Sequence, residues 1–390
     1  GLPDLYLASG GYDLYEPGTP ALQDRLFLNM GKGRFVLSES SVPNVSASSK
    51  GCVVAADYDG DGAVDLFVGG RVIPGQYPES PRSYLLHNTG KGKFEVVKTA
   101  FDEAGMITSA QWLDLNNDKK PDLILAGECT PVKVFINGKE NFIDQTAQYF
   151  ASDTHGLWFS TATADLNGDG KTDLIAGNLG RNSQVQVYDK ESSTLYYADF
   201  DGNGSIDPFF VRYIQGKSYP FVSRDELNEQ IYPMRKKFTS YKAYADAGIS
   251  DIFSAEELAK AKKLTVSENR TLAFLNKDGR YVSVQLPLEA QFSVVSKIIV
   301  QDFNGDGKTD VLLLGNKTDN RLKLGSIDAN YGCLLMGKGD GTFTYMPQTQ
   351  SGLSITGDVK SAEVITINKK PYLVVGAANE PLQWYLINAK

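Results

Sequence analysis

Five stretches of nine residues place acidic and amide side chains at the same alternating positions. They are Asp57–Asp65 (DYDGDGAVD), Asp114–Asp122 (DLNNDKKPD), Asp165–Asp173 (DLNGDGKTD), Asp199–Asp207 (DFDGNGSID) and Asp302–Asp310 (DFNGDGKTD). Positions 1, 3, 5 and 9 carry Asp or Asn, and position 6 is usually Gly, which lets the chain turn back sharply. Oxygen donors at this spacing converge on one point. These stretches are called the acidic loops below.

Calcium is the cation that this donor set predicts. Six or seven hard carboxylate and carbonyl oxygens suit Ca²⁺ better than Mg²⁺ or a transition metal. Turns of Asp, Asn and Gly without metal are the alternative for any single loop. Five copies in one frame, each with carboxylates that would repel one another, favour metal, and we expect four to five structural Ca²⁺ ions. The predicted ligands, with position 7 giving its backbone carbonyl, are Asp57, Asp59, Asp61, Ala63, Asp65, Asp114, Asn116, Asp118, Lys120, Asp122, Asp165, Asn167, Asp169, Lys171, Asp173, Asp199, Asp201, Asn203, Ser205, Asp207, Asp302, Asn304, Asp306, Lys308 and Asp310.

The loops do not fit an EF-hand. That motif needs a bidentate Glu at position 12 and flanking helices. Here position 12 is apolar in every copy: Val68, Leu125, Ala176, Phe210 and Leu313. The loops therefore belong to β-hairpins. The loop at Asp57 is the most anionic, and the loop at Asp114 is expected to be the weakest site because Lys119 replaces the Gly of the turn.

Short apolar runs flank the acidic loops and must position them. A run such as residues 52–56 precedes each loop, and most loops lead into a second run such as residues 66–69. These runs are β-branched and bounded by Gly, which is typical of strands. A third run, a Gly-rich turn and a fourth run complete the unit, as in residues 84–97. The chain is thus predicted to repeat a four-stranded unit.

The repeat count predicts an all-β fold, a seven-bladed β-propeller. The ninth positions fall at residues 4, 65, 122, 173, 207, 310 and 372, on average about 61 residues apart. Units that cannot bury both faces alone suit a closed radial arrangement. The whole chain, 1–390, is therefore predicted to be one propeller domain, with Ca²⁺ loops between strands 1 and 2 of the blades.

Two of the intervals between successive ninth positions differ from the average length. The interval from 173 to 207 is short, so the fourth unit is expected to lack its outer strand. The interval from 207 to 310 is long and predicts an insertion at 223–268 within the fifth blade. Ser223 and Ser254 each begin a capping-box pattern, and the segments 232–244 and 255–263 favour helix despite Pro233.

Composition excludes some classes of function. The 390 residues carry 39 Lys and Arg against 47 Asp and Glu, a net charge of −8 without basic clusters, which disfavours nucleic-acid binding. No apolar run is long enough to cross a bilayer, so direct membrane insertion is not expected. Residues 1–4 have neither the basic nor the apolar region of a signal peptide, so we expect that one was removed or that the chain is an excised piece. The single cysteines Cys52, Cys129 and Cys333 are expected to be buried thiols.

These motifs resemble the FG-GAP/VCBS repeat family, whose best-known fold is the integrin-α propeller. The segments 22–26, 56–62, 68–71 and 199–207 carry the likeness, which is closest to uncharacterised VCBS proteins of Bacteroidota related to cartilage acidic protein. The resemblance implies calcium in the Asp-rich loops. It also implies one propeller of a larger extracellular or outer-membrane-surface protein of the bacterial envelope, often a lipoprotein. Lys119 and Tyr372, where the last unit would have an Asp, depart from the family pattern.

Long loops predict a ligand-binding face. Connections 2–3 of a blade lie opposite the acidic 1–2 loops, and the long segments 10–24, 71–83, the insertion and 316–332 all fall there. Tyr, Trp and Arg are enriched at interfaces. The candidate ligand-binding residues are Tyr12, Tyr15, Arg71, Tyr77, Arg82, Arg224, Arg321 and Tyr331, with Trp384 nearby in the last unit. Loops that merely cover blade edges are the alternative.

Catalytic signatures are weak. Neither His87 nor His155 has a Ser or Cys partner at a recognisable spacing, and no nucleophile elbow or phosphate loop occurs. Trp112 and Trp158 are expected in the core. The function we expect is a non-catalytic, calcium-stabilised binding or scaffold module that meets a protein or glycan at the cell surface. The alternative is a glycan-active enzyme or enzyme subunit, because Glu128 and Glu380 follow second strands on the long-loop face; it requires two facing carboxyl groups about 5–10 Å apart.

Overall fold

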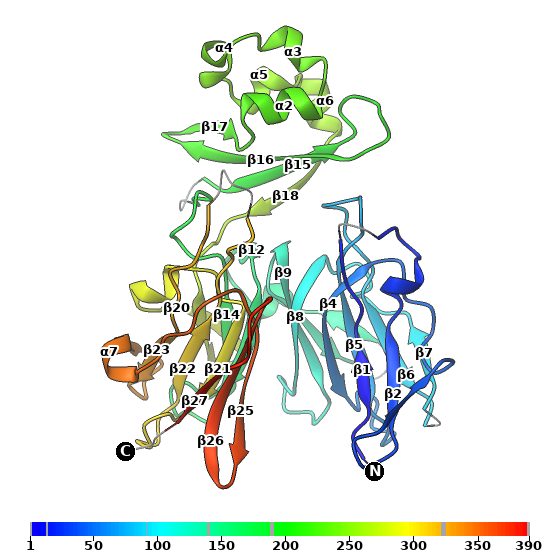
Figure 1. Ribbon diagram of the computed structural model, residues 1–390, viewed down its shortest axis with the longest axis vertical. Helices are drawn as coiled ribbons and strands as arrows, with labels where there is room; N and C mark the ends of the chain where they lie inside the picture. Colours follow the sequence, from blue (N-terminus) through cyan, green and yellow to red (C-terminus); the bar gives the residue numbers. More distant parts are fainter. Residues whose placement is uncertain are drawn as a thin grey trace.

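A computed structural model describes residues 2–12, 15–90, 92–138, 141–187, 191–320 and 325–387. In this part of the chain antiparallel strands form seven sheets, and the helices are short, so the predicted all-β class is confirmed. Six sheets, called repeat sheets 1 to 6, follow the repeat (Figure 1). The seventh, called the inserted sheet, lies with its helices at one end of the molecule, above the repeat sheets in this view.

The first three repeat sheets come from consecutive strands. Sheet 1 contains β1 (Leu5–Leu7), β2 (Arg25–Asn29) and β3 (Phe35–Ser38). Sheet 2 contains β4 (Ser49–Ala56), β5 (Asp65–Val72), β6 (Tyr84–Asn88) and β7 (Phe94–Val97). Sheet 3 contains β8 (Met106–Leu113), β9 (Asp122–Thr130), β10 (Lys133–Asn137), β11 (Phe142–Asp144) and the short β12 (Gly156–Leu157).

Repeat sheets 4 to 6 follow, and the inserted unit separates the two halves of sheet 4 in the sequence. Sheet 4 contains β13 (Ser160–Ala164), β14 (Asp173–Gly177), β19 (Leu272–Lys277) and β20 (Arg280–Gln285). Sheet 5 contains β21 (Lys297–Gln301), β22 (Asp310–Leu314), β23 (Cys333–Gly337) and β24 (Phe343–Met346). Sheet 6 contains β25 (Val359–Ile367), β26 (Lys370–Ala377) and β27 (Gln383–Leu386). Short helices outside the sheets are η1 (Pro20–Leu22), α1 (Thr146–Tyr149), η2 (Leu288–Gln291) and α7 (Gln348–Ser351).

The inserted unit interrupts sheet 4. Its strands are β15 (Ser193–Ala198), β16 (Asp207–Ile214), β17 (Lys217–Pro220) and β18 (Lys262–Val266). Its helices are α2 (Arg224–Gln230), α3 (Met234–Lys237), α4 (Tyr241–Ala245), α5 (Ile249–Ile252) and α6 (Ala255–Lys260). The side chains of Ser223 and Ser254 cap α2 and α6 in capping boxes, as predicted. Phe209, Leu227 and Phe253 belong to a core that the unit forms for itself.

This topology corrects the predicted order of seven successive blades. Strand β14 pairs with β19, so the fourth unit is complete and its two halves are separated in sequence. The hairpin that carries the loop at Asp199 is not the next blade but the start of the insertion, which extends beyond the predicted 223–268 and lies in the fourth unit rather than the fifth. The spacing of the ninth positions predicted the wrong order because this hairpin has the same Asp pattern as the hairpins of the blades. The local sequence carries no signal for the pairing of β14 with β19.

Neighbouring repeat sheets share apolar cores. Phe67 of sheet 2 packs in one cluster with Leu123 and Phe135 of sheet 3. Trp158 is fully buried between sheets 3 and 4, as predicted, while Trp112 is only partly buried. Cys129 and Cys333 are buried and Cys52 partly so, and all three are free thiols. The sheets are therefore held face to face by burial of apolar side chains.

A buried ion pair fastens sheet 1 to sheet 2. Lys50 of β4 lies 3.4 Å from Asp24, and both side chains are at most 1% exposed. The Lys50 ammonium also donates to the carbonyls of Leu22, Val45 and Ser48, while Asp24 accepts from the Tyr6 hydroxyl. Every donor of the ammonium is thus used inside the protein.

Replacing Lys50 with Met should destabilise the fold strongly. The change leaves a buried carboxylate without its cation, which costs about 3–5 kcal/mol. The matched control is Lys171→Met, which removes a pair with the exposed Asp278 and should cost less than about 1 kcal/mol. Chemical denaturation of both variants measures the difference; equal losses would contradict the assignment.

Candidate functional site

The acidic loops share one hydrogen-bonded geometry. In the first loop Asp57 Oδ1 accepts from the amides of Gly60 and Asp61 at 2.8 and 3.1 Å, and Oδ2 accepts from Gly62 at 2.9 Å. The position 1 carboxylates Asp165, Asp199 and Asp302 accept the same three amides of their own loops. The loop therefore wraps around its own first carboxylate, which gathers the oxygens of positions 1, 3 and 5 on one side.

The Asp at position 9 ties each loop to its sheet. Asp65 is fully buried; its Oδ2 accepts from the amide of Tyr58 and its Oδ1 from the amide of Asn88, at the end of the third strand. Asp122, Asp173 and Asp310 bond in the same way. Burial raises the pKa of these four carboxyls, and the two amide bonds oppose that rise. In the inserted unit Gln230 of α2 replaces the strand amide at Asp207.

Two loops bring enough charged ligands together for a cation. Among the described residues, carboxylate oxygens of Asp57, Asp59 and Asp61 lie within 4.8 Å of one another, as do those of Asp199, Asp201 and Asp207. This convergence fits the oxygen-rich shell of Ca²⁺. The remaining three loops have Asn at position 3, so their carboxylates stand only at positions 1, 5 and 9.

The loop at Asp114 keeps the common turn despite its Lys. Lys119 adopts a left-handed φ of 68°, and its amide donates to Asp114 Oδ2 at 2.9 Å, as Gly62 does to Asp57. The left-handed region costs a residue with a Cβ roughly 1–2 kcal/mol. The Lys therefore strains this turn without changing its shape.

Lys119→Gly should stabilise the protein by about 0.5–1 kcal/mol, because relief of the left-handed strain exceeds the entropy cost of Gly. Lys120→Gly is the matched control: its φ is not left-handed, so the same substitution should destabilise. Thermal or urea unfolding measures both. A loss of stability in Lys119→Gly would argue against the turn.

A large cavity lies between the inserted sheet and the repeat sheets. Its volume is about 1100 Å³. Repeat sheets 1 to 5 each contribute residues from the end of the strand that begins at or just after the ninth position of the repeat, or from the connection after that strand: Tyr12, Arg71, Tyr77, Glu128, Arg181, Lys317 and Ile327. The inserted unit contributes an apolar wall: Leu195, Pro208, Phe210, Phe221 and Val222. The long loops thus converge, as the sequence predicted, but on a cavity that the inserted unit completes.

One wall of this cavity carries an organised polar cluster. The Arg71 guanidinium pairs with Glu128 Oε2, and the Tyr77 hydroxyl donates to Glu128 Oε1 at 2.5 Å. Burial, and secondarily the charge of Glu128, raises the pKa of Tyr77 well above its usual value, so the phenol stays a donor at neutral pH. Arg71 and Tyr77, both predicted, are therefore brought together by a glutamate from the next sheet.

The other predicted ligand-binding residues do not line this cavity, Tyr12 excepted. Arg82 pairs with Asp102, and Arg224 pairs with Asp225 and lies over the ring of Tyr241. Tyr15, Tyr331 and Trp384 are exposed elsewhere, and Arg321 lies outside the described residues. Arg181 was missed although it follows the second strand of sheet 4, because the spacing had assigned the insertion to another blade. No local pattern in the sequence indicated that residues of the inserted unit form the apolar wall of the cavity.

Family comparison supports the repeats. Residues 1–68 and 114–176 match the model of an FG-GAP-like repeat, and these segments include the acidic loops at Asp57, Asp114 and Asp165. Over 243 residues the chain is 25% identical to the human T-cell immunomodulatory protein, covering 55% of this chain and 39% of that protein. The chain thus spans well under half the length of this relative. The repeat resemblance is confirmed for the matched segments, and the link to Bacteroidota stays a prediction.

Solved structures show only remote likeness. The Vibrio cholerae biofilm matrix protein Bap1 is 12% identical with a TM-score of 0.29, covering 95% of this chain and 79% of that one. The Trypanosoma rangeli sialidase, solved with sialic acid, is 11% identical with a TM-score of 0.26, covering 98% and 58%. In the described part of this chain, no helix has the length and apolar character to cross a membrane.

Proposed function

We propose that this chain is a calcium-stabilised, non-catalytic binding module of a larger extracellular or cell-envelope protein. Its ligand site would be the cavity beneath the inserted unit. The observation that carries the proposal is the convergence of residues from five repeat sheets and the inserted unit on that one cavity. Variable loops on a repeated scaffold are where binding residues concentrate.

The lining favours an anionic ligand with apolar groups. Arg71, Arg181 and Lys317 contribute three positive charges against the two negative charges of Glu128 and Glu226, in a chain whose net charge is −8. The wall from the inserted unit supplies aromatic and aliphatic contacts. An acidic segment of a protein or an acidic glycan has this combination of properties.

The two glutamates that line the cavity favour ligand binding over glycan hydrolysis, because both carboxylates are already engaged by neighbouring groups. Glu128 is engaged by Arg71 and Tyr77. Glu226 Oε2 accepts from the amide and hydroxyl of Ser223 in the cap of α2. A glycosidase needs one protonated carboxyl and one available carboxylate facing each other. Glu380, the other acid considered from sequence, does not line the cavity.

Calcium in this proposal is structural. In an antiparallel sheet the 1–2 and 2–3 connections lie at opposite ends of the second strand, so the acidic loops of the repeat sheets lie away from the cavity. Only the loop at Asp199 belongs to the inserted unit. The bound ions would neutralise the clustered carboxylates of the loops and hold the hairpins in shape.

Removing calcium should lower the melting temperature by several degrees. A cation that binds only the folded state at about 100 times its Kd stabilises by about 2.7 kcal/mol per site. Calorimetry with Ca²⁺, with chelator, and with Mg²⁺ after chelation measures this; Mg²⁺ should restore little, because it demands a tighter octahedral shell. An unchanged melt would contradict the calcium assignment.

Narrowing the cavity should weaken ligand binding. Ser326→Trp places a bulky ring at an exposed cavity-lining position, and Lys338→Trp is the control at the opposite end of sheet 5. Arrays of acidic and neutral glycans and peptides, probed in Ca²⁺, should give a signal with the wild type and Lys338→Trp that falls at least about tenfold with Ser326→Trp. Binding that Ser326→Trp leaves unchanged would place the ligand elsewhere.

A further inference from the structure

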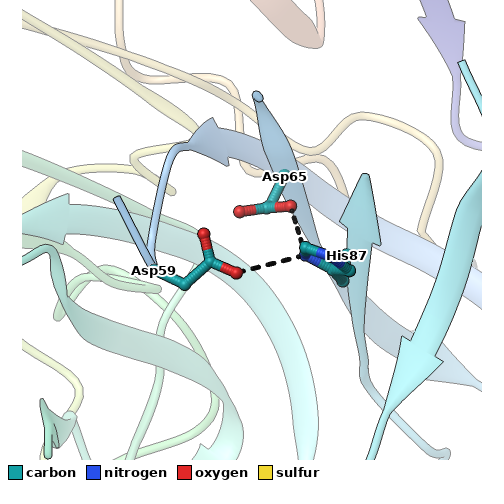
Figure 2. A group of neighbouring side chains, drawn as sticks. All are labelled: Asp59, Asp65 and His87. Atoms are coloured by element: carbon teal, nitrogen blue, oxygen red, sulfur yellow. Dashed lines mark ion pairs between the residues drawn. The ribbon is translucent and has the colours of Figure 1, made fainter. Parts of the chain in front are cut away.

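One acidic loop has a nitrogen donor beside its carboxylates. Figure 2 shows Asp59 of the first loop, Asp65 at the start of β5 and His87 of β6 pointing toward one another. His87 Nδ1 lies 3.3 Å from Asp59 Oδ2 and 3.2 Å from Asp65 Oδ1. Three ligand atoms from these side chains lie within 4.8 Å of one another. The cluster therefore joins two elements of sheet 2, the acidic hairpin and the third strand.

Each repeat sheet with an acidic loop has a residue at the position equivalent to His87, but only in sheet 2 is that residue a histidine. His87 directly precedes Asn88, whose amide is held by Asp65. The residues in the same place in sheets 3, 4 and 5 are Ile136, Leu275 and Met336, which precede the amides held by Asp122, Asp173 and Asp310. The repeat thus needs only an apolar side chain here, and packing does not account for an imidazole.

The ring nitrogen is placed as a ligand rather than as a hydrogen-bonding group. Nδ1 is shielded from solvent and lies within ion-pair distance of both carboxylates, but it makes a hydrogen bond with neither of them nor with any other described group. A buried polar atom without such a bond costs free energy. Two donors bound at about 2.0–2.1 Å to one tetrahedral ion lie roughly 3.3 Å apart. The separations of 3.2 and 3.3 Å agree with a shared ion between the three side chains.

We propose that Asp59, Asp65 and His87 form a site for a divalent transition-metal ion of the Zn²⁺ class. Imidazole nitrogen is a preferred ligand of such ions, whereas Ca²⁺ takes oxygen ligands. Two carboxylates compensate the charge of the ion, and Asp57 and Asp61 lie close enough to Asp59 to supply further oxygens. The rings of Tyr58 and His87 meet edge to face, with their centroids 6.3 Å apart. The inference does not depend on the ligand of the cavity.

Zinc titration in excess Ca²⁺ tests the site directly. The Ca²⁺ saturates the oxygen-only loops. Asp59 and Asp65 are also predicted Ca²⁺ ligands, so Zn²⁺ must displace Ca²⁺ from the loop at Asp57, and calorimetry should show one such Zn²⁺ equivalent in the wild-type protein. His87→Leu, which copies Leu275 of sheet 4, should weaken Zn²⁺ binding at least about tenfold, since even partners outside the ligand shell contribute 10–100-fold. His155→Leu is the matched control, because His155 pairs with Asp153 outside the cluster and is the one other His of the chain.

A second probe keeps the result interpretable if His87→Leu folds poorly. Asp59 lies in an exposed turn, so Asp59→Asn should fold and should also weaken Zn²⁺ binding. Co²⁺ in place of Zn²⁺ should give visible absorption that is lost in both variants. No Zn²⁺ binding in excess Ca²⁺, or equal affinity in the wild type and both variants, would overturn the proposal. Calcium-dependent melting of His87→Leu is measured in parallel, so a failure of the calcium assignment is seen separately.

Discussion

The buried aspartate at the ninth position of each acidic loop is the constraint on which the repeat depends. Its two oxygens accept one amide of the loop and one amide at the end of the third strand, so loop, second strand and third strand are fixed together. Asp4 makes the corresponding bond to the amide of Asn29 in sheet 1. Sheet 6 has Tyr372 at this position and a two-residue turn in place of the loop. Burial raises the pKa of these carboxyls, and the amide bonds oppose that rise by favouring the charged form.

Fixing one end of the sheets leaves the other end free to vary. The acidic loops are short and nearly identical, whereas the connections after the second strands differ in length and carry the cavity-lining residues. The extreme case is sheet 4, where this connection holds a complete unit with its own sheet, helices and core. That unit forms the apolar wall opposite Arg71, Tyr77 and Glu128. The repeated end of the sheets is therefore constrained by the buried aspartates, and the variable end carries the residues that line the cavity.

The same division explains how a repeated loop can differ in chemistry. Because the backbone amide after position 87 makes the structural bond, the side chain at 87 is not needed for it. An apolar residue there completes the packing in sheets 3 to 5, and a histidine there adds a nitrogen donor without changing the hairpin. Lys119 is the opposite case, a residue that strains its turn while the surrounding hydrogen bonds preserve the shape.

The sequence by itself determined the local features: the acidic loops as hairpins, the β class, the buried Trp158 and the capped helices. Each depends on neighbours within about a dozen residues, through turn preferences, strand periodicity and capping. Only the tertiary structure decided that β14 pairs with β19, that the Asp199 hairpin is inserted, and that Glu128 joins Arg71 and Tyr77. Those contacts join residues far apart in the chain, and the apolar burial that selects them depends on facing surfaces that no local pattern specifies.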